Sequence, residues 1–168
     1  MARSRAVARG LPFALAALLG SVGWGWHAGG RAAATFRATV VQVVDGDTLV
    51  VAYDDGRHDT VRMLGVDTPE TVHPDRPVEC FGPEASAYTK ARLLGARVVL
   101  ERDAELRDPY GRLLAYVSVG GARVNDELLR GGYARFLVVP PNGKHARALL
   151  RAELDARAAR RGLWDACG

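Results

Sequence analysis

The sequence has few of the residues that mark zinc-binding or membrane-spanning proteins. Its 168 residues include two cysteines and four histidines, which form no Cys/His cluster, and this argues against a zinc site. The early apolar stretch from Leu11 to Val22 is too short to span a bilayer comfortably, and Pro12 interrupts its start. No long internal repeat is visible. The length is that of one domain with a single hydrophobic core.

The N-terminal region contains no acidic residue before Asp45. Three arginines precede its apolar stretch, namely Arg3, Arg5 and Arg9. A basic start followed by a short apolar run is typical of a secretory signal peptide. We therefore expect a leader over residues 1–34, cleaved near Ala28 or among the alanines at 32–34, and a secreted protein, extracellular or periplasmic. An uncleaved N-terminal membrane anchor is the alternative.

The leader also changes what the charge implies. The whole chain carries a formal net charge of +4, with 23 basic and 19 acidic residues. Removing the three leader arginines leaves 20 basic residues against the same 19 acidic ones. The mature protein is thus nearly neutral, so any affinity for phosphate must come from locally placed arginines rather than from a general basic field.

The two cysteines, Cys80 and Cys167, lie in a chain that we expect to leave the reducing cytosol, so pairing is chemically permitted. A disulfide between them would close a long loop, for which the chain-entropy model allows roughly 4 to 5 kcal/mol of stabilisation. Two free or intermolecular thiols are the alternative.

The region from Thr35 onward consists of short β-branched runs broken by Asp, Gly and Pro, a pattern typical of a small antiparallel barrel or sandwich. Proline cannot donate a hydrogen bond to a strand ladder, so the stretch 67–83, with its four prolines, is predicted to be a surface loop. The expected strands are residues 35–44, 47–53, 58–66, 97–101, 112–119 and, as a short segment, 133–136.

Three helices are predicted between and after the strands. The first begins at Pro83 and ends near Gly95, the second starts at Asn125 as N-cap, and the third covers residues 143–161. The expected fold is mainly β with helices (α+β): a five-stranded barrel of the oligonucleotide-binding (OB-fold) type with three α-helices, formed by residues 35–168.

Three short segments concentrate residues suited to phosphate and metal chemistry: 45–48, 62–70 and 108–112. The carboxylates of Asp47, Asp67 and Glu70 supply hard oxygen ligands of the kind that calcium or magnesium prefers. The planar forks of Arg62 and Arg112 can pair bidentately with a phosphate.

Each segment also has a purely structural interpretation. The Asp-Gly-Asp sequence at 45–47 can simply make a tight turn, and Glu70 can cap backbone donors after Thr-Pro. Arg62 can be a solvated charge on an alternating strand. The residues before Arg112 suit a type I turn.

The order and spacing of four motifs resemble staphylococcal nuclease and its relatives. The motifs are Val-Val-Asp-Gly-Asp-Thr at 43–48, Arg-Met-Leu-Gly-Val-Asp-Thr-Pro-Glu-Thr at 62–71, Gly-Pro-Glu-Ala-Ser-Ala at 82–87 and Tyr-Gly-Arg-Leu-Leu-Ala-Tyr at 110–116. The resemblance extends over about residues 35–164. It implies a five-stranded barrel with three helices that hydrolyses DNA and RNA with calcium.

The resemblance also implies a role for individual residues. Asp47 and Asp67 would bind Ca²⁺ through their carboxylates and Thr68 through its backbone carbonyl. Glu70 would be the general base that activates a water. Two arginines would hold the scissile phosphate, Arg62 and Arg112, and Tyr110 would line the nucleotide site. DNA and RNA would be the substrates of a protein expected to be a monomer without a stable protein partner.

The sequence departs from the family pattern at several places. Pro109 stands where the family has a lysine, and Leu137 and Val139 replace two tyrosines near the base pocket, so nucleotide recognition is expected to differ. The cysteines also depart from the founding member, and we hypothesise that a disulfide between them ties the C-terminal tail to the barrel. Two other functions stay open: a non-catalytic nucleic-acid-binding barrel and, less favoured, a calcium-binding structural module.

Overall fold

The computed structural model describes residues 35–72, 74–75 and 77–167. The expected leader, residues 1–34, lies outside the described residues together with its cleavage site. Among the helices within the described ranges, none is both long and apolar enough to cross a membrane.

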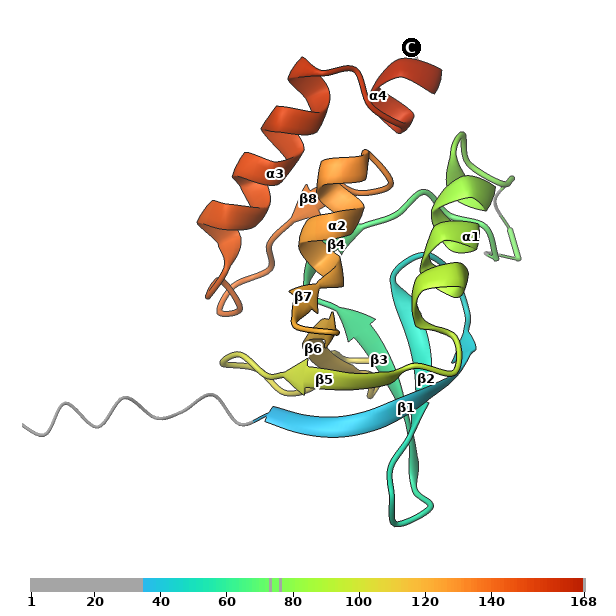
Figure 1. Ribbon diagram of the computed structural model, residues 1–168, viewed down its shortest axis with the longest axis vertical. Coiled ribbons are helices and arrows are strands. Elements are labelled where there is room, and N and C mark those ends of the chain that lie inside the picture. Colours follow the sequence, from blue (N-terminus) through green and yellow to red (C-terminus); the bar gives the residue numbers. More distant parts are fainter. Residues whose placement is uncertain (1–34, 73, 76, 168) are drawn as a thin grey trace, which may run out of the picture. The chain divides into compact units, whose positions relative to one another are not determined.

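Five strands form a closed barrel (Figure 1). Their order is β3-β2-β1-β5-β6, and a parallel pairing of β3 with β6 closes the ring, whereas the other barrel neighbours pair antiparallel. The expected barrel with helices (α+β) is therefore confirmed. Its strands are β1 (Thr35–Val43), β2 (Thr48–Ala52), β3 (His58–Met63), β5 (Arg97–Glu101) and β6 (Leu113–Val119).

The helices lie on one side of the barrel, where α2 packs against α3 (Figure 1). All three expected helices are present, and a fourth short helix follows them. The bounds are α1 (Gly82–Leu93), α2 (Val124–Gly131), α3 (Ala146–Ala158) and α4 (Leu163–Ala166); the two-residue strand β7 (Ala122–Arg123) precedes α2.

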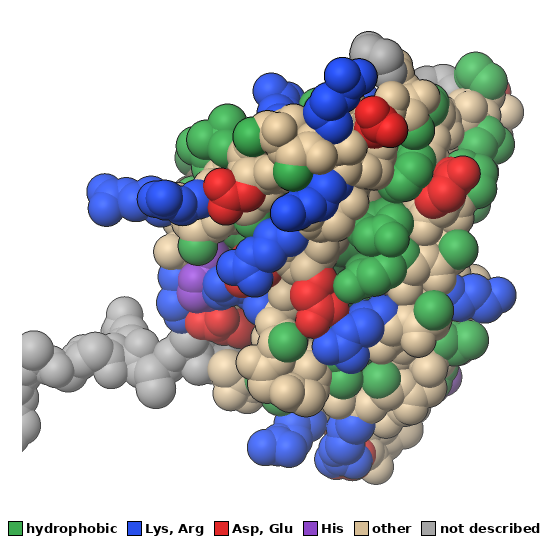
Figure 2. All heavy atoms as spheres, turned by 45° about the horizontal axis from the view of Figure 1, so that its top comes forward, with side chains coloured by type: hydrophobic (Ala, Val, Ile, Leu, Met, Phe, Trp, Pro, Cys, Tyr) green, Lys and Arg blue, Asp and Glu red, His purple; other side chains and the backbone are tan. Residues whose placement is uncertain are grey.

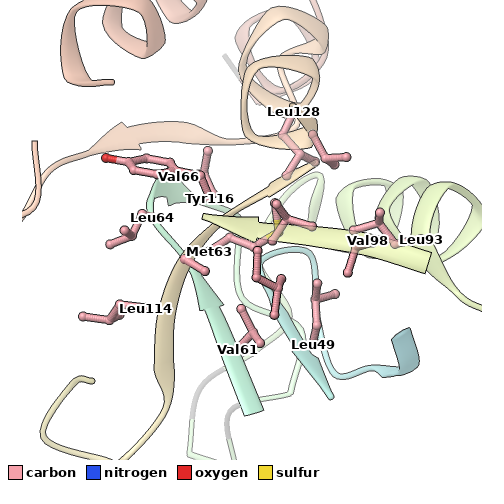
Figure 3. Close-up of a cluster of buried hydrophobic side chains, with 14 of the residues drawn as sticks. Leu49, Val61, Met63, Leu64, Val66, Leu93, Val98, Leu114, Tyr116 and Leu128 are labelled. Atoms are coloured by element: carbon pink, nitrogen blue, oxygen red, sulfur yellow. The ribbon is translucent and has the colours of Figure 1, made fainter. Parts of the chain in front are cut away.

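One hydrophobic core fills the barrel and the space beneath the helices (Figure 3). On β3, Val61 and Met63 are buried while Arg62 between them is only partly buried, which is the alternation expected of a strand with one core face. Leu128 of α2 packs into the same cluster. Full burial of one such side chain contributes about 1.5–3 kcal/mol to the stability of the fold. The alternation of apolar residues therefore determines which face of β3 packs into the core.

The expected strand 58–66 is interrupted, and this corrects the prediction. β3 ends at Met63, and residues from Gly65 onward form a separate strand, β4 (Gly65–Asp67), paired with β8 (Arg135–Leu137). Gly65 has φ +76°, and a Cβ there would collide with the side chain of Leu149. The chain therefore leaves the barrel at this glycine, and the residues after it are free to build a site outside the ring.

Asn125 does not cap α2, contrary to the prediction. The N-cap position is Arg123, and Asn125 is fully buried inside the first turn. Its amide donates to Leu64 O at 2.7 Å and its Oδ1 accepts from Val117 N at 2.9 Å. This buried amide joins the turn between β3 and β4 to β6. It stabilises the fold more than an exposed cap would, because an unpaired buried carbonyl is costly.

The predicted disulfide between Cys80 and Cys167 is present, with Cα atoms 5.9 Å apart and a sequence separation of 87. Replacing both cysteines with alanine is expected to lower the free energy of unfolding by up to about 4–5 kcal/mol, because the unfolded chain regains the entropy of a long open loop. Urea denaturation measures this change. A reducing agent should lower the denaturation midpoint of the wild type but not that of the double variant. Equal midpoints for the oxidised wild type and the double variant would contradict the prediction.

Candidate active site

Asp47 lies at the start of β2 with its carboxylate turned inward, and it is 5% exposed. Its Oδ1 accepts from Thr48 Oγ1 at 3.0 Å and its Oδ2 from the backbone N–H of Thr68 at 2.9 Å. Burial raises the pKa of the Asp47 carboxyl to about 6, although Arg62 opposes the rise; the nearby Asp45 adds to it. The charged form of this buried carboxylate is therefore stabilised by a nearby positive charge.

The turn that carries Asp47 is fixed from two sides. Asp45 Oδ1 accepts from Asp47 N at 3.1 Å, which is the tight turn that the structural interpretation predicted. Thr89 of α1 donates its hydroxyl to Gly46 O at 2.7 Å, and a Cβ on Gly46 would lie 2.7 Å from the Thr68 side chain. The turn is therefore both a structural turn and a rigid mount for the Asp47 carboxylate.

Arg62 lies on β3 and joins the two candidate metal-binding carboxylates. Its Nη1 is 3.0 Å from Asp47 Oδ2 and its Nη2 is 3.0 Å from Asp67 Oδ1. Nη1 also donates to the backbone oxygens of Met63 and Val66 at 3.0 and 2.8 Å. The Arg62 side chain is only 16% exposed, so it is not the solvated outward charge of the structural interpretation.

Glu70 follows Thr68 by two residues in the same segment. Its Oε1 accepts from the backbone N–H groups of Thr71 at 2.9 Å and Val72 at 2.8 Å, which is the capping role that the structural interpretation allows. Its own N–H donates to Glu79 Oε2 at 3.2 Å. Direct contacts thus join Asp47, Arg62, Asp67 and Thr68, and Glu70 lies two residues after Thr68 in the same segment.

Arg112 and Tyr110 lie on the turn before β6. Arg112 Nε donates to Asp108 Oδ2 at 2.6 Å, and its guanidinium lies 5.4 Å from the centre of the Tyr110 ring, which is 85% exposed. Asp108 Oδ1 also accepts from the backbone N–H groups of both residues, at 3.0 and 2.9 Å. Asp108 therefore orients the Arg112 side chain as well as forming the turn, whereas the sequence predicted only the turn.

A pocket of about 270 Å³ unites the two arginines. Leu137 and Val139 line it, as does Pro109, so all three departures from the family pattern face the same space. The complete lining is Arg62, Met63, Leu64, Gly65, Val66, Glu105, Asp108, Pro109, Tyr110, Arg112, Leu114, Leu137, Val139 and Asn142. Two guanidinium groups in a pocket with many apolar lining residues are suited to a phosphate attached to a flat or apolar group.

Charge is mixed on one face of the molecule. Figure 2 shows Lys and Arg side chains interspersed there with Asp and Glu side chains and with hydrophobic ones. Positive charge on this face is thus not gathered into one broad patch.

Arg107 holds the turn of Tyr110 and Arg112 against β3, and the sequence analysis missed this residue. Its guanidinium binds Asp59 at 2.9 and 2.7 Å and also donates to Gly111 O at 2.6 Å. Because Asp59 and Arg62 share β3, this contact couples the two arginine-bearing segments. Only the spatial pairing of β3 with β6 reveals it.

Replacing Arg107 with alanine is expected to lower the kcat of any phosphodiester cleavage by about fivefold, the factor that about 1 kcal/mol makes in a rate. The turn loses its attachment to β3, and Arg112 is then held less firmly. Steady-state kinetics measures the change. Arg97→Ala is the matched control, because Arg97 pairs with Asp54 at 2.6 Å without touching the pocket; equal losses in both variants would contradict the prediction.

Glu101, the last residue of β5, binds two basic residues that follow Asn142 in sequence. Glu101 binds the Lys144 ammonium, and its Oε2 lies 2.9 Å from His145 Nε2. Burial alone would raise the pKa of Glu101, but the hydrogen bonds from Lys144 and His145 outweigh it and hold that pKa below its usual value.

Because the pKa of Glu101 is lowered by folding, its ionised form adds stability above the unfolded-state pKa, and this contribution disappears as the pH falls through the folded-state value. Glu101→Gln is therefore expected to destabilise the protein at neutral pH, by an amount that shrinks as the pH falls below about 4.3. Urea denaturation at several pH values measures the difference. A gap that stays constant down to acid pH would contradict it.

The candidate metal-binding carboxylates are two rather than three. Over the residues that the structure describes, no group of three or more His, Cys, Asp or Glu side chains is placed to hold a metal ion. Asp47 and Asp67 nevertheless both contact the guanidinium of Arg62. A hard cation bound beside this guanidinium would have two side-chain carboxylates and would draw its further oxygen ligands from the backbone or from water.

Comparison with known proteins assigns the family. The family described as staphylococcal nuclease homologue matches residues 60–166. The thermonucleases of Staphylococcus hyicus and Staphylococcus intermedius are 42% and 43% identical to this chain over 126 residues, which is 75% of this chain and 74% of each relative. Endonuclease YncB of Bacillus subtilis is 41% identical over 132 residues, 77% of this chain and 62% of that protein. Since the family match covers more than half of the chain, from within β3 to the end of α4, the chain belongs to the staphylococcal nuclease homologue family.

Proposed function

We propose that this protein is a calcium-dependent nuclease that hydrolyses phosphodiester bonds of DNA and RNA by general-base-assisted attack of water. The observation that carries the proposal is the convergence of Asp47 and Asp67 on the Arg62 guanidinium, beside a pocket that also holds Arg112. The names of the relatives, thermonuclease and endonuclease, support the same reaction class.

The donor chemistry around Asp47 fits calcium. The candidate ligands are the carboxylates of Asp47 and Asp67 and the backbone carbonyl of Thr68, all hard oxygens without sulfur or imidazole. Burial of Asp47 favours a partner cation, since its carboxylate is otherwise costly to ionise. Bound Ca²⁺ would offset phosphate charge and help to orient the substrate.

The two arginines are proposed to bind the scissile phosphate. A guanidinium fork matches two phosphate oxygens, and its pairing strengthens as negative charge grows in the pentacoordinate transition state. Arg62 is oriented by its contacts with two carboxylates and two backbone oxygens, whereas Arg112 is oriented by Asp108. Both groups are thus largely pre-positioned before substrate arrives, which reduces the cost of reorganisation.

Glu70 is the proposed general base. A carboxylate within hydrogen-bond reach of a water can accept the proton of that water as it attacks phosphorus. Oε1 is occupied by two backbone donors, which orients the carboxylate without neutralising it. Water is then the nucleophile, so no covalent enzyme intermediate forms.

The nucleotide base is expected to rest against an aliphatic wall and one aromatic ring. Tyr110 offers its exposed ring for stacking, while Leu137 and Val139 offer only side-chain methyl groups. Aliphatic side chains give less stacking energy than aromatic ones. We therefore propose cleavage of both DNA and RNA with weak dependence on base identity.

Secretion is part of the proposal and rests on the basic and apolar N-terminal sequence. The Cys80–Cys167 disulfide supports it, because such bonds persist mainly in oxidising compartments. A membrane anchor in place of a cleaved leader is the alternative. We further propose a monomer that acts without a stable protein partner.

The test is nuclease activity of the mature domain, residues 35–168, on single-stranded DNA and RNA with calcium and with a chelator. Cleavage with calcium that the chelator abolishes is the expected result. A folded protein that binds the nucleic acid in both conditions but cleaves in neither would instead be a non-catalytic binding barrel. Binding of calcium without any affinity for nucleic acid would favour the structural module.

A further inference from the structure

The segment of residues 79–82 holds the backbone of Glu70 from one side. Glu79 pairs with it twice: Glu79 Oε2 accepts from Glu70 N at 3.2 Å, and Glu79 N donates to Glu70 O at 2.9 Å. Gly82 approaches so closely that a Cβ there would lie 3.1 Å from Glu70 O. The position of Glu70 thus depends directly on where this segment lies.

The chain between Glu70 and this segment contributes little to holding itself in place. Val72 and Val78 are 55% and 58% exposed, and Glu79 is exposed as well. Exposed apolar side chains such as these gain little free energy to offset the entropy lost when the loop is ordered. The backbone contacts of Glu79 and Gly82 with Glu70 therefore add directly to the order of the Glu70 segment.

The disulfide anchors the segment of residues 79–82. Cys80, the residue after Glu79, is bonded to Cys167, which directly follows α4. α4 is itself fixed, since Leu163 is 2% exposed and its N–H donates to Gly132 O at 2.9 Å. A covalent path thus connects α4, which is anchored by the buried Leu163, to the residue next to Glu79.

A second, weaker attachment exists next to the first. The Phe81 ring stacks on the Tyr133 ring with centroids 5.7 Å apart. An aromatic pair of this kind contributes about 0.5–1.5 kcal/mol, so it can keep the segment near the barrel without fixing it as rigidly as a covalent bond. Loss of the disulfide is therefore expected to loosen the Glu79 segment rather than to unfold the domain.

We propose that Glu79, held by the Cys80–Cys167 disulfide, is a positioning residue for Glu70, so that full turnover requires the oxidised cysteine pair. The proposal rests on the proposed function, in which Glu70 is the general base. A dithiol reductant would convert the disulfide into two thiols by giving it two electrons and two protons, and would itself become a disulfide. The nuclease would then be least active in a reducing compartment and fully active after oxidation.

The expected signature is a loss of kcat without a change of KM. The two arginines of the pocket belong to β3 and to the turn before β6, and neither cysteine lines the pocket. A misplacement of a reacting group by about 1 Å can cost up to about 100-fold in rate. We expect about a tenfold lower kcat for the reduced wild type, for the double variant Cys80→Ser/Cys167→Ser and for Glu79→Ala.

Two further variants separate positioning from other effects. Glu79→Gln keeps an oxygen that can accept from Glu70 N, so it should recover most of the activity lost in Glu79→Ala. Glu84→Ala removes an exposed glutamate from the first turn of α1 and should leave kcat unchanged. The double cysteine variant should not respond to a dithiol.

The experiment measures kcat and KM on single-stranded DNA with calcium, at a temperature well below the unfolding midpoint of every protein, with circular dichroism to verify folding. A tenfold lower kcat at constant KM, rescued in Glu79→Gln, supports the inference. Wild-type kcat in the fully folded reduced protein and in Glu79→Ala would overturn it and leave the disulfide a stabilising bond only. Absence of calcium-dependent cleavage by the oxidised wild type would instead contradict the proposed function.

Discussion

Replacing Glu70 with glutamine is expected to lower kcat by about 10²–10⁴-fold, while the affinity for single-stranded DNA changes little. Glutamine keeps an oxygen that can accept from the backbone N–H groups of Thr71 and Val72, so the local structure should persist. It cannot take a proton from water, however, and the reaction loses its general base. Steady-state kinetics with calcium, combined with a binding measurement in chelator, separates the two effects.

The control for this variant is Glu84→Gln, which removes a carboxylate on the surface of α1 and should leave kcat unchanged. Equal activity of Glu70→Gln and the wild type would show that another group, or solvent alone, removes the proton. A parallel loss of binding and turnover would show that Glu70 supports the shape of the site rather than the chemical step.

Replacing Arg112 with alanine is expected to lower kcat by about 10²–10³-fold with a much smaller rise in KM. The guanidinium binds the phosphate most strongly in the transition state, where the charge on the oxygens is greatest, so its loss affects turnover more than substrate binding. Arg112→Lys should restore little activity, because an ammonium cannot form the two parallel hydrogen bonds of the fork. The same reasoning applies to Arg62.

Arg112→Ala also frees Asp108, which loses its 2.6 Å contact, so the stability of the variant has to be measured beside its kinetics. Arg57→Ala is a suitable control, since Arg57 is an exposed arginine that pairs with Asp55 in the β2–β3 turn. Near wild-type turnover of Arg112→Ala would contradict the role proposed for this residue. A large rise in KM at constant kcat would reassign it to substrate binding.

Arg62 is harder to interpret than Arg112. Removing its guanidinium leaves Asp47 and Asp67 without the cation that joins them in the absence of metal. A buried carboxylate that loses its partner is destabilising, so Arg62→Ala would combine a kinetic loss with a structural one. The cleaner measurement of transition-state stabilisation is therefore made at Arg112.

Much of this protein follows from local sequence. The period-two alternation around Val61 and Met63 predicts a strand with Arg62 on its other side, because adjacent strand residues point to opposite faces. The Asp-Gly-Asp turn and the turn before Arg112 are also local, since Asp side chains bond their own backbone two residues on. The two cysteines allowed only one intramolecular disulfide, and the order of the four motifs indicated the family.

Contacts between distant residues are what the sequence leaves open. The strand 58–66 reads as continuous, yet it is interrupted between Met63 and Gly65, where Gly65 has a positive φ and lies close to Leu149 of α3. Asn125 is not the expected N-cap but is buried, with hydrogen bonds to Leu64 and Val117. The sequence did not predict a role for Arg107 or Glu79, since neither residue is part of a motif. Periodicity and turn chemistry depend on neighbours within a few residues, whereas closure of the barrel, the convergence of Asp47, Arg62 and Asp67, and the attachment of the Glu70 loop depend on pairings that exist only once the chain has folded.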